Sequence, residues 1–220
     1  MGDNYTAQLL ALDSCAVSDA LDSMGLPPSA VGIAPLTVPK KIAGSILTVK
    51  LLPGSPPGGS SRHLGTAAIA AASPGQIIAI QHAPGIECAG WGGVLSVGAQ
   101  LRGVGGVILD GPARDIDEAR ALEFPVYATS AIARTARGRV YEADFTCTVE
   151  ISGIAVAPGD YALADASAVV FVPARHIDEI LRRAKRIVAR EWLMVEALRN
   201  GQQVTDVVGR DYEAMLDELE

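Results

Sequence analysis

Three observations predict an α/β fold for this chain. A glycine-rich turn, a short helix and a buried strand follow one another within residues 91–115. Several short β-branched segments lie close together between residues 146 and 172, and a long helical pattern runs from Pro173 to about Asn200. Helices that alternate with apolar strands are typical of layered α/β domains. Because the sequence contains no repeat and no clean boundary, we expect a single domain over residues 1–220.

The N-terminal half alternates between helical and extended patterns. Apolar residues recur at helical spacing from Thr6 to Met24, and Gly25 ends the pattern. An Ala-rich helix ends at Ala72, with Ser60 or Ser61 as its expected N-cap. The other expected elements are strands over residues 44–52, 76–81 and 104–109 and a helix over residues 94–102.

The C-terminal half begins with a short acidic helix over residues 116–122 and a strand in the segment FPVYATS. Closely spaced Gly, Pro and Asp turns then indicate a β-rich layer. Its expected strands cover residues 146–151, 154–157, 161–165 and 168–172. After the long helix, residues 201–220 read as a connector and a final acidic helix.

Composition excludes several classes of protein. Hydrophobic residues make up 49% of the 220 residues and aromatic residues only 5%, so the core must be aliphatic. The net charge of −7 argues against a nucleic-acid binder, which needs a basic face. The three isolated cysteines favour reduced thiols in a cytoplasmic protein. We expect no signal peptide and no membrane span.

The start of helix 94–102 is a candidate anion site. Its first backbone N–H groups have no intrahelical partner and carry the positive end of the helix dipole. The N–H groups of Gly93, Val94 and Leu95 are therefore expected to bind a substrate carboxylate.

The polar segment DGPARD follows the central strand, at an edge where α/β proteins place ligands. Asp115 is the expected ligand of Mg²⁺ or Mn²⁺, which prefer oxygen ligands. Arg114 would neutralise charge on a keto oxygen, and a 2-oxo acid would chelate the metal. The alternative is a purely structural turn in which Asp115 caps the next helix and Asp110 holds the backbone.

Two histidines are further candidates. His82 follows a strand directly and is expected either to act as an acid or base or to be a structural loop residue. Arg62 and His63, at the start of the Ala-rich helix, either face the substrate or are exposed to solvent. Cys88 is expected to be a small buried filler rather than a nucleophile.

The stretch WGGVLSVGAQLRGVGGVILDGPARD resembles the family that includes the regulator of ribonuclease E activity and the 4-hydroxy-4-methyl-2-oxoglutarate/4-carboxy-4-hydroxy-2-oxoadipate aldolases. DALDSMG, IAGSILTV, SPGQIIAI and FPVYA extend the resemblance over most of the chain. It implies a swivelling β/β/α sandwich with a long C-terminal helix, assembled as homotrimers or homohexamers with sites between subunits.

The resemblance also implies roles for individual residues. Arg114 would contact a substrate oxygen and Asp115 the metal, while the amides of Gly92, Val94 and Leu95 line the turn. Glu191 of a neighbouring subunit would assist the hydrated metal. The chain departs from the family pattern at Gly93, where an acidic residue is usual, and at Gln81 and His82, where the preceding strand usually ends in Asp residues.

These observations lead to one functional hypothesis and two alternatives. The first is a metal-dependent carbon–carbon lyase that acts on a small 2-oxo or 4-hydroxy-2-oxo acid, by aldol cleavage or decarboxylation through an enolate. Arg114, Asp115 and His82 are its expected catalytic residues. The alternatives are a non-catalytic regulator that binds a ribonuclease, and a lyase or hydratase for an unrelated hydroxy acid.

Overall fold

A computed structural model describes residues 2–56 and 63–208 of the chain, and its centre is an eight-stranded mixed sheet. The strand order is β1-β5-β4-β3-β2-β9-β10, and β6 pairs with β2 beside this path. The strands of this sheet are β1 (Ala34–Pro35), β2 (Ile42–Pro53), β3 (Ile77–Gln81), β4 (Gly106–Ala113), β5 (Val126–Ala131), β6 (Val140–Phe145), β9 (Tyr161–Ala164) and β10 (Val169–Val172).

Strands β2 to β5 form the parallel part of the sheet, and the other pairings are antiparallel. The long strand β2 joins the two parts, because its first residues pair with β9 and its middle residues pair with β3. A separate hairpin consists of β7 (Val149–Ile151) and β8 (Ile154–Val156). The carboxyl ends of β3, β4 and β5 therefore lie along one edge.

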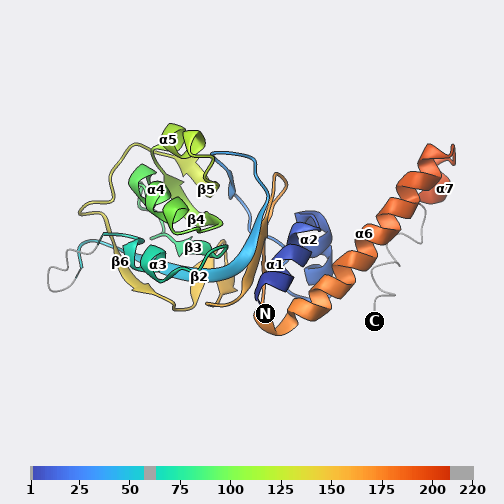
Figure 1. The fold of residues 1–220 in the computed structure, drawn as a ribbon, viewed down its shortest axis with the longest axis horizontal. Helices are drawn as coiled ribbons and strands as arrows, with labels where there is room; N and C mark the ends of the chain where they lie inside the picture. Colours follow the sequence, from blue (N-terminus) through green and yellow to red (C-terminus); the bar gives the residue numbers. More distant parts are fainter. Residues whose placement is uncertain (1, 57–62, 209–220) are drawn as a thin grey trace.

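The helices form two groups (Figure 1). The group α3, α4 and α5 lies over the parallel strands, while α1, α2 and α6 lie beyond the far end of β2, where α6 extends away from the body. The helices are α1 (Gly2–Leu10), α2 (Ser14–Asp22), α3 (Thr66–Ala71), α4 (Gly93–Leu101), α5 (Ile116–Ala121), η2 (Ala174–His176), α6 (Ile177–Arg199) and α7 (Val204–Val207).

Three groups of buried side chains hold these layers together, and most are aliphatic. One fills the space between the parallel strands and α3, α4 and α5. A second joins α1, α2 and α6 to β9 and β10, and a third lies between the sheet and the β7–β8 hairpin. Layers of two sheets and helices confirm the predicted α/β sandwich, and the long closing helix is also confirmed.

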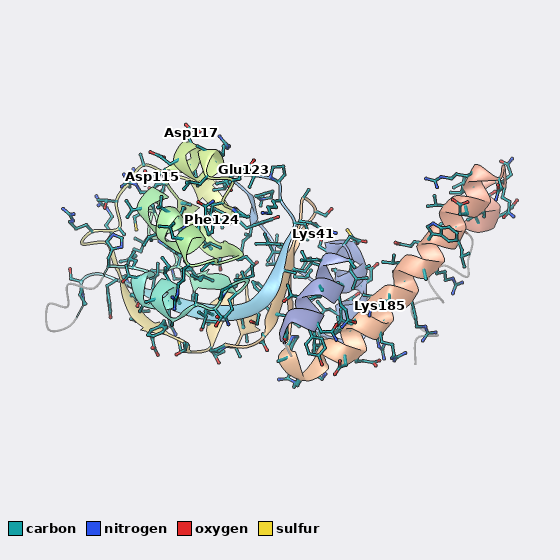
Figure 2. All side chains as sticks on the ribbon, viewed as in Figure 1. Lys41, Asp115, Asp117, Glu123, Phe124 and Lys185 are labelled. Atoms are coloured by element: carbon teal, nitrogen blue, oxygen red, sulfur yellow. The ribbon has the colours of Figure 1, made fainter. Side chains whose placement is uncertain are left out.

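The expected helix over residues 6–24 is wrong, since the structure has two helices there. Asp13 interrupts the pattern, because its carboxylate Oδ1 accepts a hydrogen bond from the Ala16 N–H at 2.8 Å and caps α2. Lys41 helps to close the preceding helix by donating from Nζ to the Leu12 carbonyl oxygen at 2.6 Å (Figure 2). Apolar spacing alone cannot distinguish one helix from two that present the same face.

Other elements also differ from the prediction. Strand β4 continues to Ala113, so the expected turn DGPA is strand, with an irregular register between Leu109 and Pro112. Strand β6 was not expected at all. The N-cap of α3 is Gly65, while Ser60, Ser61 and Arg62 lie outside the described residues, as does most of the expected final helix.

All three cysteines are free thiols. None of the helices in the described part of the chain is both long enough and apolar enough to cross a bilayer.

Candidate active site

The glycine turn before α4 lies against the end of strand β4. The Gly90 N–H donates to the Pro112 carbonyl oxygen at 2.9 Å, and the Arg114 N–H donates to the Trp91 carbonyl oxygen at 3.0 Å. Trp91 and Ala113 form an isolated parallel bridge. These contacts explain why two segments about twenty residues apart in the sequence form one site: the strand returns the chain to the helix start.

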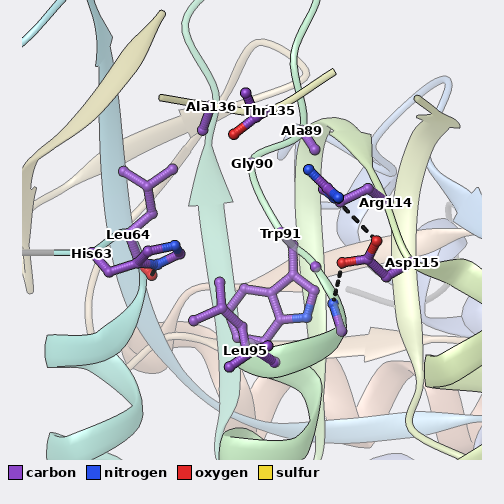
Figure 3. A pocket seen from close by; sticks show the side chains of 13 residues that line it. His63, Leu64, Ala89, Gly90, Trp91, Leu95, Arg114, Asp115, Thr135 and Ala136 are labelled. Carbon is purple, nitrogen blue, oxygen red and sulfur yellow. Dashed lines mark hydrogen bonds and ion pairs between the residues drawn. The ribbon is translucent and has the colours of Figure 1, made fainter. Parts of the chain in front are cut away.

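Asp115 connects the two segments through its side chain (Figure 3). Its carboxylate Oδ2 accepts from the Gly93 N–H at 2.9 Å, and Oδ1 accepts from Arg114 Nε at 3.0 Å. The Gly93 hydrogen bond and then the Arg114 guanidinium hold the pKa of Asp115 below its usual value. Asp115 adopts the left-handed conformation with φ of 57°, and its side chain makes no capping bond to α5. The carboxylate therefore points toward the glycine turn.

Close packing explains both glycines of the turn. A Cβ atom at Gly92 would lie 2.8 Å from Asp115 Oδ2 and 3.1 Å from Arg114 Cγ. A Cβ atom at Gly93 would lie 3.1 Å from the Asp115 Cβ. A side chain at either position would press on the Arg114–Asp115 pair. Glycine at position 93 therefore leaves the space that the Asp115 side chain occupies.

A cavity of about 240 Å³ opens beside this pair. Its volume lies below the range of ~300–1,000 Å³ typical of pockets for drug-sized ligands, so it suits a small metabolite. Figure 3 shows the Trp91 indole and Leu95 between His63 on one wall and Arg114 and Asp115 on the other. The lining residues are His63, Leu64, Ala89, Gly90, Trp91, Gly92, Gly93, Val94, Leu95, Arg114, Asp115, Thr135 and Ala136.

The structure brings most of the expected site residues to this cavity. Gly92 to Leu95 form its helix-start side, and Arg114 and Asp115 form the charged side. The Gly93 N–H is already bonded to Asp115, so the N–H groups of Val94 and Leu95 remain as the anion-binding groups of the first turn.

His82 does not reach the cavity. It is 5% exposed, with Nδ1 3.0 Å from the Ala83 carbonyl oxygen and Nε2 3.7 Å from Cys88 Sγ. A Cβ atom at Gly111 or Gly90 would lie 2.6 Å or 2.9 Å from the nearest atom of His82, so the residue fits a slot that only glycines leave open. Burial lowers the pKa of His82. This placement fits the alternative in which His82 is a structural loop residue. Cys88 is buried beside His82, as expected of a small buried filler.

Asp110 also points elsewhere. Its Oδ2 accepts from the Ser152 N–H at 2.7 Å and ties β4 to the β7–β8 hairpin. Asp110 and Asp115 therefore do not point toward one common ion. The hydrogen bond of Asp110 fits the alternative in which this residue holds the backbone.

Glu191 lies on α6, away from the cavity of its own chain. Figure 2 shows Asp115 on the side of α4 and α5, whereas Lys185, on the same helix as Glu191, lies beyond the far end of the sheet. Burial, then Asp13 and Asp19, raises the pKa of Glu191. Glu191 and Asp115 of one chain cannot hold the same ion, so a shared site would need two subunits.

Thr135 and Ala136 are among the lining residues that the sequence did not indicate. The segment that carries them reaches the cavity because the Ala89 N–H donates to the Arg134 carbonyl oxygen at 2.9 Å and Arg134 pairs with Glu87. The sequence of this segment shows the charges of Arg134, Arg137 and Arg139, but nothing in it indicates the contact with residues 87–89.

The donor set fits Mg²⁺ or Mn²⁺ held through one carboxylate. Asp115 is the sole carboxylate among the described residues that line the cavity, and no group of three or more His, Cys, Asp and Glu residues with metal-binding spacing occurs in residues 2–56 and 63–208. A carboxylate has about four lone-pair sites, so Asp115 retains capacity beside its two hydrogen bonds. Mg²⁺ is commonly bound by one or two carboxylates, with waters and substrate as the other ligands.

Comparison with known proteins agrees with the fold. The family model RraA-like, described as Aldolase/RraA, matches residues 14–171. The crystal structure of an uncharacterized protein from Pseudomonas syringae pv. tomato is similar with a TM-score of 0.82 at 25% identity, covering 95% of this chain and 98% of that one.

Two curated relatives are similar over most of the chain. Protein DlpA of Legionella pneumophila is 29% identical over 198 residues, which make up 90% of this chain but 32% of DlpA. This chain thus spans about a third of the length of DlpA. A Halalkalibacterium halodurans protein, named "Putative 4-hydroxy-4-methyl-2-oxoglutarate aldolase", is 27% identical over 188 residues and 83% of each chain.

Proposed function

The chain belongs to the RraA-like family, and on that premise we propose that it is a divalent-metal-dependent lyase that cleaves a carbon–carbon bond in a small 2-oxo or 4-hydroxy-2-oxo carboxylic acid. One observation carries the proposal. The Asp115 carboxylate bonds to both the glycine turn and Arg114 at the edge of a cavity of metabolite size. The aldolase name of the Halalkalibacterium relative supports the same reaction class.

In the proposed reaction, the residues of the cavity have separate roles. The N–H groups of Val94 and Leu95 bind the substrate carboxylate at the positive end of α4. The Arg114 guanidinium stabilises the negative charge that develops on the keto oxygen as the bond breaks. Asp115 orients Arg114 through the bond to Nε. Trp91 and Leu95 make the floor apolar, which strengthens these interactions.

Asp115 would hold Mg²⁺ or Mn²⁺, which would supply Lewis acidity next to the 2-oxo acid. Glu191 of the partner subunit would assist it in a homotrimer or homohexamer, which is the assembly that the family resemblance suggests.

The test is the Asp115→Ala variant, assayed for pyruvate release from oxaloacetate and from 4-hydroxy-4-methyl-2-oxoglutarate with Mg²⁺ or Mn²⁺. We expect a loss of at least ~1,000-fold in kcat/KM, because both the cation site and the orientation of Arg114 are lost. The matched control is Asp117→Ala: its carboxyl group is 95% exposed and pairs with Arg120 on the surface of α5.

Full activity of Asp115→Ala, or of the wild-type protein in excess chelator, would reject the proposal. If the wild-type protein releases no pyruvate from either acid and binds neither metal nor oxalate by calorimetry, the family's non-catalytic role as a protein-binding regulator becomes the better description.

A further inference from the structure

His63 lines the cavity but has no role in the scheme above. It lies just before α3, where its carbonyl oxygen accepts from Thr66 Oγ1 at 2.7 Å. Figure 3 shows its imidazole on the wall opposite Arg114 and Asp115, with the Trp91 indole between them. A substrate held at the carboxylate and keto end by Arg114 would extend toward this wall.

A hydrogen bond to the backbone selects the tautomer of the neutral His63 imidazole. His63 Nδ1 lies 3.2 Å from the Leu64 carbonyl oxygen. A carbonyl oxygen only accepts, so Nδ1 must carry a proton, and in the neutral imidazole Nε2 then presents a lone pair. Within residues 2–56 and 63–208, no protein group is hydrogen-bonded to Nε2. The ring is therefore prepared to accept a proton at Nε2.

The other titratable side chains of the cavity are poor bases. A guanidinium group donates hydrogen bonds and accepts none, so Arg114 cannot serve as the base. The Gly93 N–H and Arg114 lower the pKa of Asp115, which weakens that carboxylate as a base. His82 is buried outside the lining. Among the described lining residues, His63 alone carries a ring nitrogen whose lone pair can accept a proton and return it.

We propose that His63 is the acid–base residue of this site, an inference that rests on the proposed lyase function. In aldol cleavage, Nε2 removes the proton of the hydroxyl group on C4 of the substrate. The O–H electron pair forms the new carbonyl at C4, and the C3–C4 bond breaks. Its electron pair forms the C2–C3 double bond of an enolate, whose negative charge lies on the C2 oxygen beside Arg114. The imidazolium then returns its proton to C3, which yields the smaller 2-oxo acid.

The positions of Arg114 and His63 suit the two substrate atoms on which they would act. Aldol cleavage needs a cation near the C2 oxygen and a base near the C4 hydroxyl, on different substrate atoms. Arg114 and His63 stand on opposite walls, so each can reach one of these atoms without neutralising the other.

The test compares His63→Ala with His176→Ala, which changes a histidine at the start of α6, far from the cavity. Two reactions are measured with Mg²⁺: cleavage of 4-hydroxy-4-methyl-2-oxoglutarate, and exchange of the pyruvate methyl protons in deuterated water, followed by NMR. General acid–base catalysis contributes ~10²–10⁴-fold. We expect His63→Ala to lose at least ~100-fold in both reactions, and His176→Ala to match the wild-type protein.

Binding is measured separately, so that a positioning effect can be recognised. In a Trp192→Phe background Trp91 is the one remaining tryptophan of the chain, and its fluorescence reports pyruvate at the cavity floor. We expect the Kd of pyruvate to change by less than about threefold in His63→Ala, and added imidazole to restore part of the lost turnover.

The outcomes separate the two proposals. Equal cleavage and exchange in His63→Ala and the wild-type protein would overturn the His63 assignment and leave the lyase function standing. A weakened Kd with unchanged kcat would also overturn it, since His63 would then only bind substrate. A wild-type protein that neither cleaves nor exchanges would overturn both.

Discussion

Two regions of this molecule contain carboxylates whose pKa values shift in opposite directions. At the cavity, Asp115 bonds to the Gly93 N–H and to Arg114, and its pKa is lowered. On α2 and α6, burial raises the pKa values of Asp19 and Glu191. The negative charges of Asp22 and Asp13 add to the shift of Asp19, and those of Asp13 and Asp19 add to the shift of Glu191. The first region stabilises the ionised carboxylate, whereas the second destabilises ionised carboxylates.

The difference shows that the number of acidic residues in a region is a poor guide to the position of a metal site. The α2–α6 region has more carboxylates, but no described group of three or more residues there has metal-binding spacing. The cavity has one carboxylate, but a cation and an amide hold it ionised in one orientation. A lone carboxylate in such surroundings remains charged and available to an ion over a wide pH range.

Gly92→Ala should produce the largest effect of the variants that test this comparison. The new Cβ would lie 2.8 Å from Asp115 Oδ2, so the carboxylate must move. A displacement of about 1 Å at a catalytic group costs roughly 100-fold, so we expect kcat/KM for pyruvate release to fall by about that factor.

Gly98→Ala is the matched control, since it adds the same methyl group inside α4, the helix that Gly92 precedes as its N-cap. Its Cβ would meet only Ile69 Cγ2, at 4.0 Å. We expect unchanged activity and a gain of about 0.5–1 kcal/mol in the free energy of unfolding, measured in urea, because alanine favours the helix. Equal activity in both alanine variants would contradict the proposed role of the glycine turn.

Glu191→Gln should have an intermediate effect if the two regions meet between subunits. Residues that support a metal site typically contribute 10–100-fold, so we expect kcat/KM to fall about tenfold or more with Mg²⁺, while gel filtration shows the same assembly. Unchanged activity with slightly higher stability would instead assign Glu191 to the acidic cluster of its own chain.

The smallest expected effects are on stability, and their signs oppose each other. The raised pKa of Asp19 means that its contribution is present below the unfolded pKa of ~4 and is lost as pH rises, so Asp19→Asn should stabilise the fold at pH 7. The lowered pKa of Asp115 means the reverse, so Asp115→Asn should destabilise it at pH 7. Solvent screening limits each change to about 0.5 kcal/mol.

Urea unfolding at pH 7 and pH 3 measures both variants. The difference between Asp19→Asn and the wild-type protein should vanish at pH 3, where Asp19 is protonated in both states. The destabilisation by Asp115→Asn should shrink at pH 3, as Asp115 begins to protonate. Changes of the same sign at pH 7 would contradict the comparison.

Local sequence determined the elements whose residues are neighbours along the chain. The central unit was predicted because its turn, helix and strand follow one another, and the end of β4 returns to the start of α4. Apolar periodicity predicted α6, β-branched runs predicted β2 and β3, and closely spaced turns predicted β9 and β10. The glycine turn and the Arg114–Asp115 pair of the candidate site came from this local information.

Only the tertiary structure decided which distant residues complete the cavity and which candidates leave it. His63 and Thr135 reach it from segments whose positions depend on the order of strands in the sheet. His82 is excluded because Gly90 and Gly111, far apart in sequence, leave a slot for its ring. Periodicity and capping depend on interactions within a few residues, whereas the filling of a cavity depends on side-chain shapes that meet only after the layers have packed.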